Sequence, residues 1–212
     1  MNEVVLPAGV RGIVFDVGET PVDETHAWSQ QAEMVGVTPF ALMGVLGALI
    51  ERGEAHRRVW EVLGVERPAM STPITEADLY PDAILCLVAA KAAGLVVGIA
   101  GNQPDATEAE LRVAGFRPDF IASSSAWAAA KPSPVFFDKI AAAAGMEPGA
   151  ILYVGDRLDN DIVPAREAGM HTAFIRRGPW GYIHAKWQNA TVADISLDSL
   201  NQLTKAFETK LG

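Results

Sequence analysis

The stretch RGIVFDVGET, which runs from Arg11 to Thr20, carries an apolar segment directly up to an acid. Residues Arg11–Phe15 form a short apolar run that stops at Asp16, and Gly18 follows two positions later. A run of this length, bounded by an acid and a glycine, is typical of a buried strand. We therefore predict a buried strand whose carboxyl end presents the carboxylate of Asp16.

The segment that follows has a helical pattern and contains no convincing strand. Single glycines separate the expected helices, which span Glu24–Val35, Pro39–Arg52 and Glu54–Leu63. We interpret residues 24–79 as an all-helical insertion, a small cap, between the first strand and the rest of the sheet. Residues 1–23 and 80–212 are then expected to form the α/β core.

After Tyr80 the sequence alternates between strand and helix. Further strands are expected at Leu95–Ala100, Phe120–Ser123, Ala150–Val154 and Thr172–Ile175. Helices are expected at Pro81–Ala93, Asp105–Ala114, Ser133–Ala144 and Asn160–Ala168, with a closing helix at Leu197–Leu211. Strands spaced in this way with helices between them indicate a doubly wound parallel sheet, so the predicted fold class is α/β, Rossmann-like, with a small helical cap.

The chain is acidic, with 17 Lys and Arg residues against 26 Asp and Glu residues and a net charge of −9. Such a surface repels nucleic-acid backbones and anionic membranes, so neither is expected as a main partner. Cys86 is the only cysteine, which excludes an intramolecular disulfide and favours a reducing compartment. The opening residues lack the basic region of a signal peptide, and we expect a soluble cytoplasmic protein. A monomer and a homodimer are both compatible with the sequence.

Polar residues follow the predicted strands at the edge where an open parallel sheet binds its ligands. Asp16 and Asp156 come directly after two of these strands. Asp16 would by itself be explained as a helix cap, whereas the place of Asp156 after Gly155 at a strand end favours a metal ligand. Together they can share a cation, and Mg²⁺ prefers carboxylate and phosphate oxygens. A metal held there would turn a phosphate towards Asp16, whose free oxygen could attack it to give an aspartyl-phosphate.

Two charged residues are expected to support this site. Lys131 precedes a proline, which favours an extended conformation outside a helix, and it would supply a fixed cation among acids and phosphate. Asp161 lies one turn beyond Asp156 and is expected to act indirectly, on water or on Lys131.

Four motifs make the chain resemble the haloacid dehalogenase-like (HAD) superfamily. They are DVGET at Asp16–Thr20, VGIAGNQ at Val97–Gln103, KPSPVFF at Lys131–Phe137 and VGDRLDND at Val154–Asp161. The helical insertion resembles the small cap of the first HAD subfamily. The resemblance covers nearly the whole chain, in the family's order.

The resemblance implies a role for each matching residue. Asp16 would be the nucleophile, and Lys131 would steady both it and the phosphoryl group. The carboxylates of Asp16 and Asp156 and the carbonyl of Gly18 would hold Mg²⁺. Backbone amides around Gly101 and Asn102 would bind the phosphate of a small phosphorylated metabolite.

Two positions depart from the family pattern. Gly18 stands where most HAD phosphatases carry a second Asp that acts as general acid and base, and Gly101 stands where a Ser or Thr would contact phosphate. Losing a general acid typically costs about 10²–10⁴-fold in rate. His26, near the start of the predicted cap, is a candidate substitute.

Three functions are therefore weighed. The first is a Mg²⁺-dependent phosphomonoester hydrolase. The second is a catalytically weakened or non-catalytic binding protein that keeps the fold, as the glycines at positions 18 and 101 suggest. The third is a metal-independent 2-haloacid dehalogenase. That class also lacks the general acid, because a departing halide needs no proton, but the acids of GDRLDND at Gly155–Asp161 argue against it.

Overall fold

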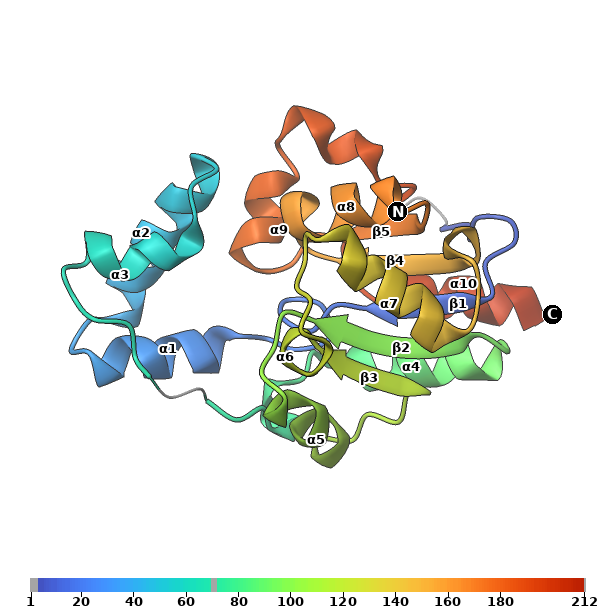
Figure 1. Cartoon of the computed structure of the whole chain (residues 1–212), viewed down its shortest axis with the longest axis horizontal. Coiled ribbons are helices and arrows are strands. Elements are labelled where there is room, and N and C mark those ends of the chain that lie inside the picture. The colour runs from blue at the N-terminus through green and yellow to red at the C-terminus, as the bar shows by residue number, and fades with distance from the viewer. Residues whose placement is uncertain (1–3, 70–71, 212) are drawn as a thin grey trace.

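The computed structural model describes residues 4–69 and 72–211, and its centre is a parallel β-sheet (Figure 1). The sheet has six strands in the order β3-β2-β1-β4-β5-β6, and every neighbouring pair is parallel. Their bounds are Gly12–Phe15 (β1), Val96–Gly101 (β2), Phe120–Ser123 (β3), Ile151–Gly155 (β4), His171–Ile175 (β5) and Ile195–Leu197 (β6). The order runs outward from β1 in both directions, which confirms the doubly wound α/β fold.

Helices cover both faces of this sheet, and β1 shows how the sequence directs its side chains. Ile13 and Phe15 pack in the cluster that includes residues of α4 (Ala83–Ala92) and α10 (Asn201–Leu211). Val14 packs in the opposite cluster, which includes residues of α7 (Pro134–Ala144). Successive strand residues face opposite sides, so a strand buried on both faces reads as a continuous apolar run. Burying a side chain such as Phe15 contributes roughly 1.5–3 kcal/mol.

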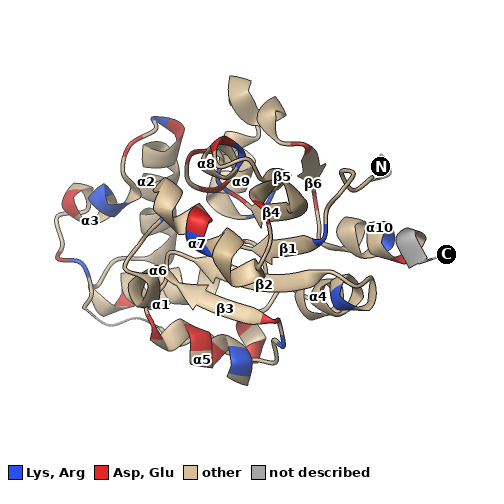
Figure 2. Ribbon diagram, turned by 45° about the vertical axis from the view of Figure 1, so that its right-hand side comes forward, with Lys and Arg blue, Asp and Glu red and all other residues tan. Residues whose placement is uncertain are grey.

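The remaining core helices complete the two layers. They are α5 (Ala106–Val113), the short α6 (Ser124–Trp127), α8 (Val163–Glu167) and α9 (Gly178–His184). Basic and acidic residues are interspersed on the ribbon, as on α5, which carries both kinds (Figure 2). Within the described residues no single helix is long and apolar enough to cross a membrane, and the one helix pair that passes jointly, Thr25–Met34 with Pro39–Glu51, is bent by 112°.

Three helices lie together to one side of the sheet (Figure 1). They are α1 (Thr25–Met34), α2 (Pro39–Glu51) and α3 (Val59–Val62), the last preceded by a 3₁₀ turn at His56–Arg58. α2 begins where the sequence predicts, because Pro39 occupies its first turn and the Thr38 hydroxyl accepts a hydrogen bond from Ala41 N at 3.2 Å. We keep the name cap for residues 24–79, a division that stays a prediction.

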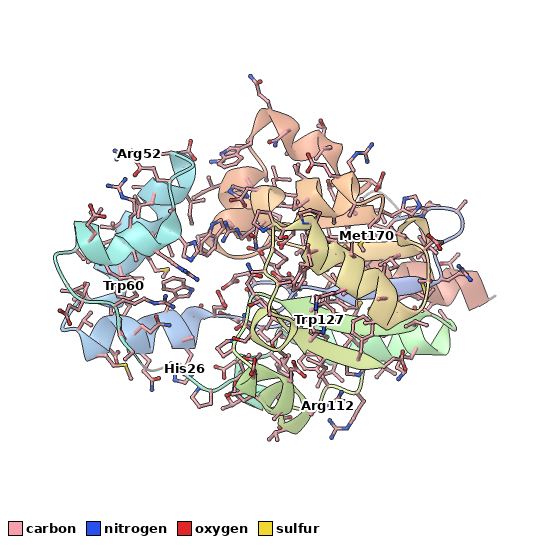
Figure 3. The ribbon with its side chains drawn as sticks, in the orientation of Figure 1. His26, Arg52, Trp60, Arg112, Trp127 and Met170 are labelled. Carbon is pink, nitrogen blue, oxygen red and sulfur yellow. The ribbon has the colours of Figure 1, made fainter. Side chains whose placement is uncertain are left out.

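The cap has a core of its own, in which Trp60 lies between the helices (Figure 3). That core includes a buried residue from outside the cap, Trp180 of α9, which is 6% exposed, and Ile183 of the same helix packs against it. The sequence analysis predicted no helix at Gly178–His184, since its two glycines and proline are poor helix formers. Tertiary packing decides here: a side chain on Gly181 would come within 2.9 Å of the Ile175 carbonyl oxygen.

Two further differences concern chain segments after β4. The helix predicted at Asn160–Ala168 is divided, because a π-helical turn at Leu158–Ile162 precedes α8. In that turn both Asp161 N and Ile162 N donate to the carbonyl of Arg157. The closing helix begins later than expected, since residues 195–197 form the edge strand β6, which the sequence did not predict.

Candidate functional site

Three acids meet at the carboxyl ends of β1 and β4. These strands are neighbours, and Phe15 pairs with Val154, so the residues that follow them lie side by side. Asp16, Asp156 and Asp161 each offer a carboxylate oxygen, and the three oxygens lie within 4.8 Å of one another. All three residues are buried. The structure thus brings together the two strand-end acids singled out in the sequence, with Asp161 beside them.

Lys131 joins this cluster from the loop before α7. Its Nζ lies 2.6 Å from Asp16 Oδ1 and 2.6 Å from Asp161 Oδ1, and the residue is 4% exposed. Burial disfavours the charged ammonium group, but the carboxylates of Asp16 and Asp161 outweigh it and raise the pKa of Lys131 well above its usual value. Lys131 is therefore a fixed positive charge inside the acidic cluster.

Asn102 holds the Lys131 loop in place. Lys131 N donates to Asn102 Oδ1 at 2.8 Å, and Asn102 Nδ2 donates to the Lys131 carbonyl oxygen at 2.9 Å. Asn102 follows β2, so this paired contact ties the end of β2 to the loop that delivers the lysine. The binding of phosphate by backbone amides at Gly101 and Asn102 stays a prediction.

Asp161 is positioned by the backbone around it. Its Oδ2 accepts a hydrogen bond from Arg157 N at 3.0 Å, while its Oδ1 faces Lys131. Gly155 makes this approach possible, because a Cβ there would lie 2.5 Å from Asp161 Oδ2. Burial raises the pKa of Asp161 to about 6, against the lowering effect of Lys131. Asp161 thus has its charge partner in place, whereas its neighbour Asp156 does not.

Asp156 carries the feature that points to a cation. Its Oδ2 is buried and has no hydrogen-bond partner among the described residues. Burial, followed by the charges of Asp161 and Asp16, raises the pKa of Asp156 well above its usual value. A buried carboxylate with no partner is costly, and a divalent cation shared with Asp16 would satisfy it. The donor set is all oxygen, which suits Mg²⁺.

The two glycines that depart from the HAD pattern both lie against functional side chains. A Cβ on Gly101 would lie 2.6 Å from Asp16 Oδ1, so Asp16 fills the space where a side chain would begin. Gly18 lines the cavity beside Asp16, and its carbonyl as a metal ligand stays a prediction. Glycine at position 101 therefore does more than remove a hydroxyl group, because the absence of a side chain leaves room for Asp16, the predicted nucleophile.

Gly101→Ser tests this steric role. Although it restores the hydroxyl typical of the family, we expect it to lower phosphate release by at least about tenfold, since displacing a reacting group by a fraction of an ångström is costly. The comparison is initial rates of purified wild type and variant on one phosphate ester. Gly149→Ser is the matched control, since a Cβ there meets its nearest atom at 3.8 Å. Equal or higher activity of Gly101→Ser would contradict the steric explanation.

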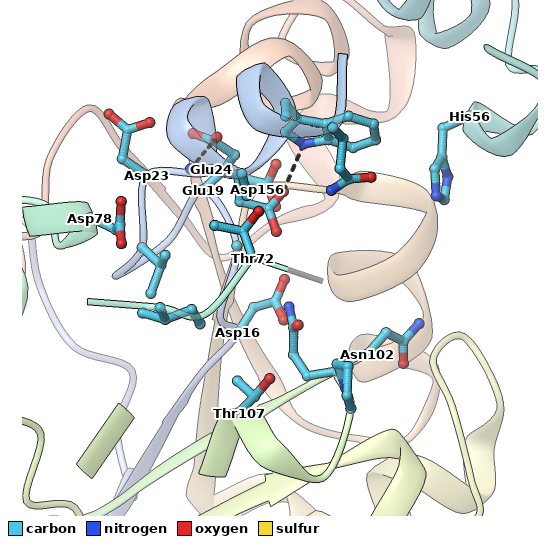
Figure 4. Close-up of a pocket in the computed structure, with 18 of the residues that line it drawn as sticks. Asp16, Glu19, Asp23, Glu24, His56, Thr72, Asp78, Asn102, Thr107 and Asp156 are labelled. Atoms are coloured by element: carbon cyan, nitrogen blue, oxygen red, sulfur yellow. Dashed lines mark hydrogen bonds between the residues drawn. The ribbon is translucent and has the colours of Figure 1, made fainter. Parts of the chain in front are cut away.

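A cavity of about 610 Å³ lies over the acids, between the cap and the sheet (Figure 4). Its floor includes Asp16, Lys131 and Asp156, and cap residues such as Trp28 and His56 line it from the other side. A site of this kind, with charged groups at the bottom and aromatic groups above, suits a small ligand that carries one anionic end.

Glu24 is a cavity residue that the sequence analysis missed. It directly precedes α1, and burial, together with the charge of Glu19, raises the pKa of its carboxyl to about 7. No motif marks it, because its side-chain direction depends on how the cap joins the core. His26, the substitute acid considered from the sequence, also lines the cavity, but its Nδ1 lies 3.1 Å from Asp78 Oδ1 and its side chain is 56% exposed.

The sequence profile of the HAD-hydrolase-like family matches residues 128–194, the segment that contains Lys131, Asp156 and Asp161. The solved HAD phosphatase from Thermococcus onnurineus has the same fold, with a TM-score of 0.62 at 20% identity, and the match covers 92% of this chain and 97% of that one. The family match thus covers residues 128–194, and the chain as a whole has the HAD-like fold. The L-2-haloacid dehalogenase from Xanthobacter autotrophicus is similar too, with a TM-score of 0.70 at 18% identity over 94% of this chain and 98% of that one. At these identities the likeness shows the HAD fold alone.

Curated relatives of this chain are named glyceraldehyde 3-phosphate phosphatase. The protein from Methanocaldococcus jannaschii is 31% identical over 127 residues, which are 58% of this chain and 54% of that protein. The protein from Methanopyrus kandleri is 40% identical over 73 residues, 34% of this chain and 31% of that protein. The chain thus spans about half, or less, of the length of these relatives.

Proposed function

We propose that this chain is a Mg²⁺-dependent phosphomonoester hydrolase that acts on a small phosphorylated metabolite. The observation that carries the proposal is the buried cluster of Asp16, Asp156 and Asp161 oxygens, with Asp156 Oδ2 unpaired among the described residues. A phosphate-directed cation site beside a buried lysine is the arrangement that phosphoryl transfer requires.

Asp16 and Asp156 would hold the metal, because Lys131 contacts only one oxygen of Asp16 and Asp156 Oδ2 has no hydrogen-bond partner among the described residues. Lys131 already balances Asp161 and one oxygen of Asp16. When bound, Mg²⁺ would supply positive charge to the phosphate oxygens and orient them towards Asp16. The rest of the chemistry falls to side chains of the protein.

Asp16 is the proposed nucleophile. Its carboxylate oxygen forms a bond to phosphorus while the bond from phosphorus to the ester oxygen breaks, which leaves an aspartyl-phosphate and an alkoxide that takes up a proton and departs as the alcohol. Water then attacks the phosphorus and gives up a proton, which releases phosphate and restores the free Asp16 carboxylate. Lys131 holds the Asp16 carboxylate in place through their 2.6 Å contact, and it offsets the negative charge that accumulates during both steps.

The substrate is proposed to be small because the cavity is bounded by the cap. A volume of about 610 Å³ is that of an ordinary metabolite site. The curated relatives are named for a triose phosphate, so glyceraldehyde 3-phosphate is the first ester to try. A cytoplasmic location agrees with the free, buried Cys86 and stays a prediction.

The direct test is phosphate release from a panel of small phosphate esters by purified protein, with Mg²⁺ and with a chelator. We expect turnover with Mg²⁺, loss of turnover on chelation and recovery when Mg²⁺ is returned. A parallel panel of 2-haloacids, scored for halide, examines the dehalogenase alternative. Halide release without metal, or a complete lack of phosphate release, would overturn the proposal.

A further inference from the structure

The carboxyl group of Glu24 occupies the space next to Gly18. A Cβ built on Gly18 would lie 2.5 Å from Glu24 Oε1 and 2.6 Å from Glu24 Cδ. The φ angle of Gly18 lies outside the left-handed region, so this position requires glycine for space and not for backbone conformation. A side chain at position 18 and the present side chain of Glu24 exclude each other.

Glu24 is held in this place by its neighbours. Trp28 Nε1 donates to Glu24 Oε2 at 3.2 Å, and Glu24 N donates to Glu19 Oε1 at 3.1 Å. Glu24 lies at the junction of the core and the first cap helix, and it lines the same cavity as Asp16 and Asp156 (Figure 4). A fixed carboxyl group therefore faces the reacting region from the cap side.

We propose that Glu24 is the catalytic group that transfers the proton to the leaving oxygen, in place of the side chain absent at position 18. The inference rests on the proposed phosphomonoesterase function and deepens it. As the Asp16 oxygen bonds to phosphorus and the ester bond breaks, the Glu24 carboxyl gives its proton to the departing alkoxide, which leaves as the alcohol. When water later attacks the aspartyl-phosphate, the Glu24 carboxylate takes a proton from it and is restored.

The other acids near Gly18 have different partners. Glu19 Oε2 accepts the Tyr80 hydroxyl at 2.6 Å, and its Oε1 accepts Glu24 N, so both of its oxygens are engaged. Asp23 Oδ1 accepts Thr25 N at 2.9 Å, in the turn that starts α1. Among the described side chains, the three nearest atoms to a Cβ at position 18 all belong to Glu24.

Glu24→Gln separates this role from a structural one. The variant keeps the shape and the acceptor for Trp28 but cannot protonate a leaving group. We expect kcat/KM to fall by about 10²–10⁴-fold for alkyl phosphates, whose alkoxides leave poorly. For 4-nitrophenyl phosphate, whose leaving group needs no proton, kcat/KM should stay within about tenfold of wild type. That ester should also give a burst of nitrophenol, because hydrolysis of the aspartyl-phosphate is then slow. Glu33→Gln, an exposed change on α1, the helix that Glu24 directly precedes, is the control.

Rescue at position 18 examines the geometry itself. In a Glu24→Ala background, Gly18→Asp would place a new carboxyl in the vacated space, and we expect kcat/KM for alkyl phosphates to rise at least about tenfold above that of Glu24→Ala alone. Gly18→Asp with Glu24 intact should impair the enzyme, since the two side chains collide. Thermal unfolding of each variant shows whether it is folded.

Several outcomes would overturn the inference. One is an equal loss by Glu24→Gln on alkyl and aryl esters, and another is a double variant no better than Glu24→Ala. Full activity of Glu24→Gln on alkyl esters would also reject it. These results presuppose turnover by the wild type, whereas a wild type that hydrolyses no ester would reject the proposed function first and this role with it.

Discussion

Asp16→Asn is expected to abolish phosphate release, lowering kcat by about 10⁴–10⁶-fold, as removal of a nucleophile does in enzymes that form covalent intermediates. The amide has nearly the same shape as the carboxylate but cannot attack phosphorus. Mg²⁺-dependent turnover of one ester by wild type and variant is the measurement. Asp138→Asn, the same chemical change at an exposed position of α7, should retain wild-type activity.

The fold of Asp16→Asn should survive, which separates chemistry from stability. Lys131 keeps Asp161 as a partner at 2.6 Å, and Asp156 loses a repelling neighbour. We expect the thermal midpoint to stay within about 4 °C of wild type, equivalent to about 1–2 kcal/mol for a chain of this size. A folded Asp16→Asn variant that keeps a tenth or more of the activity would rule out Asp16 as the nucleophile.

The meeting of Asp16 and Asp156 follows from sequence because parallel strands order their own ends. Both acids come directly after apolar runs, and buried strands with helices between them place their carboxyl ends at one edge. The position of Lys131 follows from the same argument, because the loop that carries it returns to that edge of the sheet. These inferences need only periodicity and chain direction, which the sequence contains.

Glu24 and α9 show where such reasoning stops. The direction of the Glu24 side chain depends on the angle at which the cap leaves the core and on a hydrogen bond from Trp28. α9 forms despite its glycines because Trp180 is buried against cap helices that lie far away in sequence. In both cases long-range packing overrides local preference, and periodicity carries no information about it. The sequence likewise shows that position 18 lacks a carboxyl, but not which residue fills the space.

Lys131→Met is expected to be the most destabilising single change at the site. Removing the ammonium group leaves the facing carboxylates of Asp16 and Asp161 buried without their shared partner. Breaking a buried ion pair from one side costs about 3–5 kcal/mol. For a chain of this size, that corresponds to a midpoint about 6–20 °C lower in thermal unfolding without metal. Lys139→Met, an exposed change on α7, is the matched control and should unfold close to wild type.

Thermal unfolding of Lys131→Met also tests whether the site binds a cation, and this test does not depend on turnover. If Asp16 and Asp156 hold Mg²⁺, added Mg²⁺ should raise the midpoint of Lys131→Met by more than that of wild type, because the cation then offsets charge that the lysine no longer balances. Activity should stay low even with Mg²⁺, since a cation bound to two carboxylates does not replace an ammonium group aimed at Asp16 Oδ1 and Asp161 Oδ1. A midpoint equal to that of Lys139→Met, with or without Mg²⁺, would mean that the acids keep their places without a positive partner, and the electrostatic account of the site would fail.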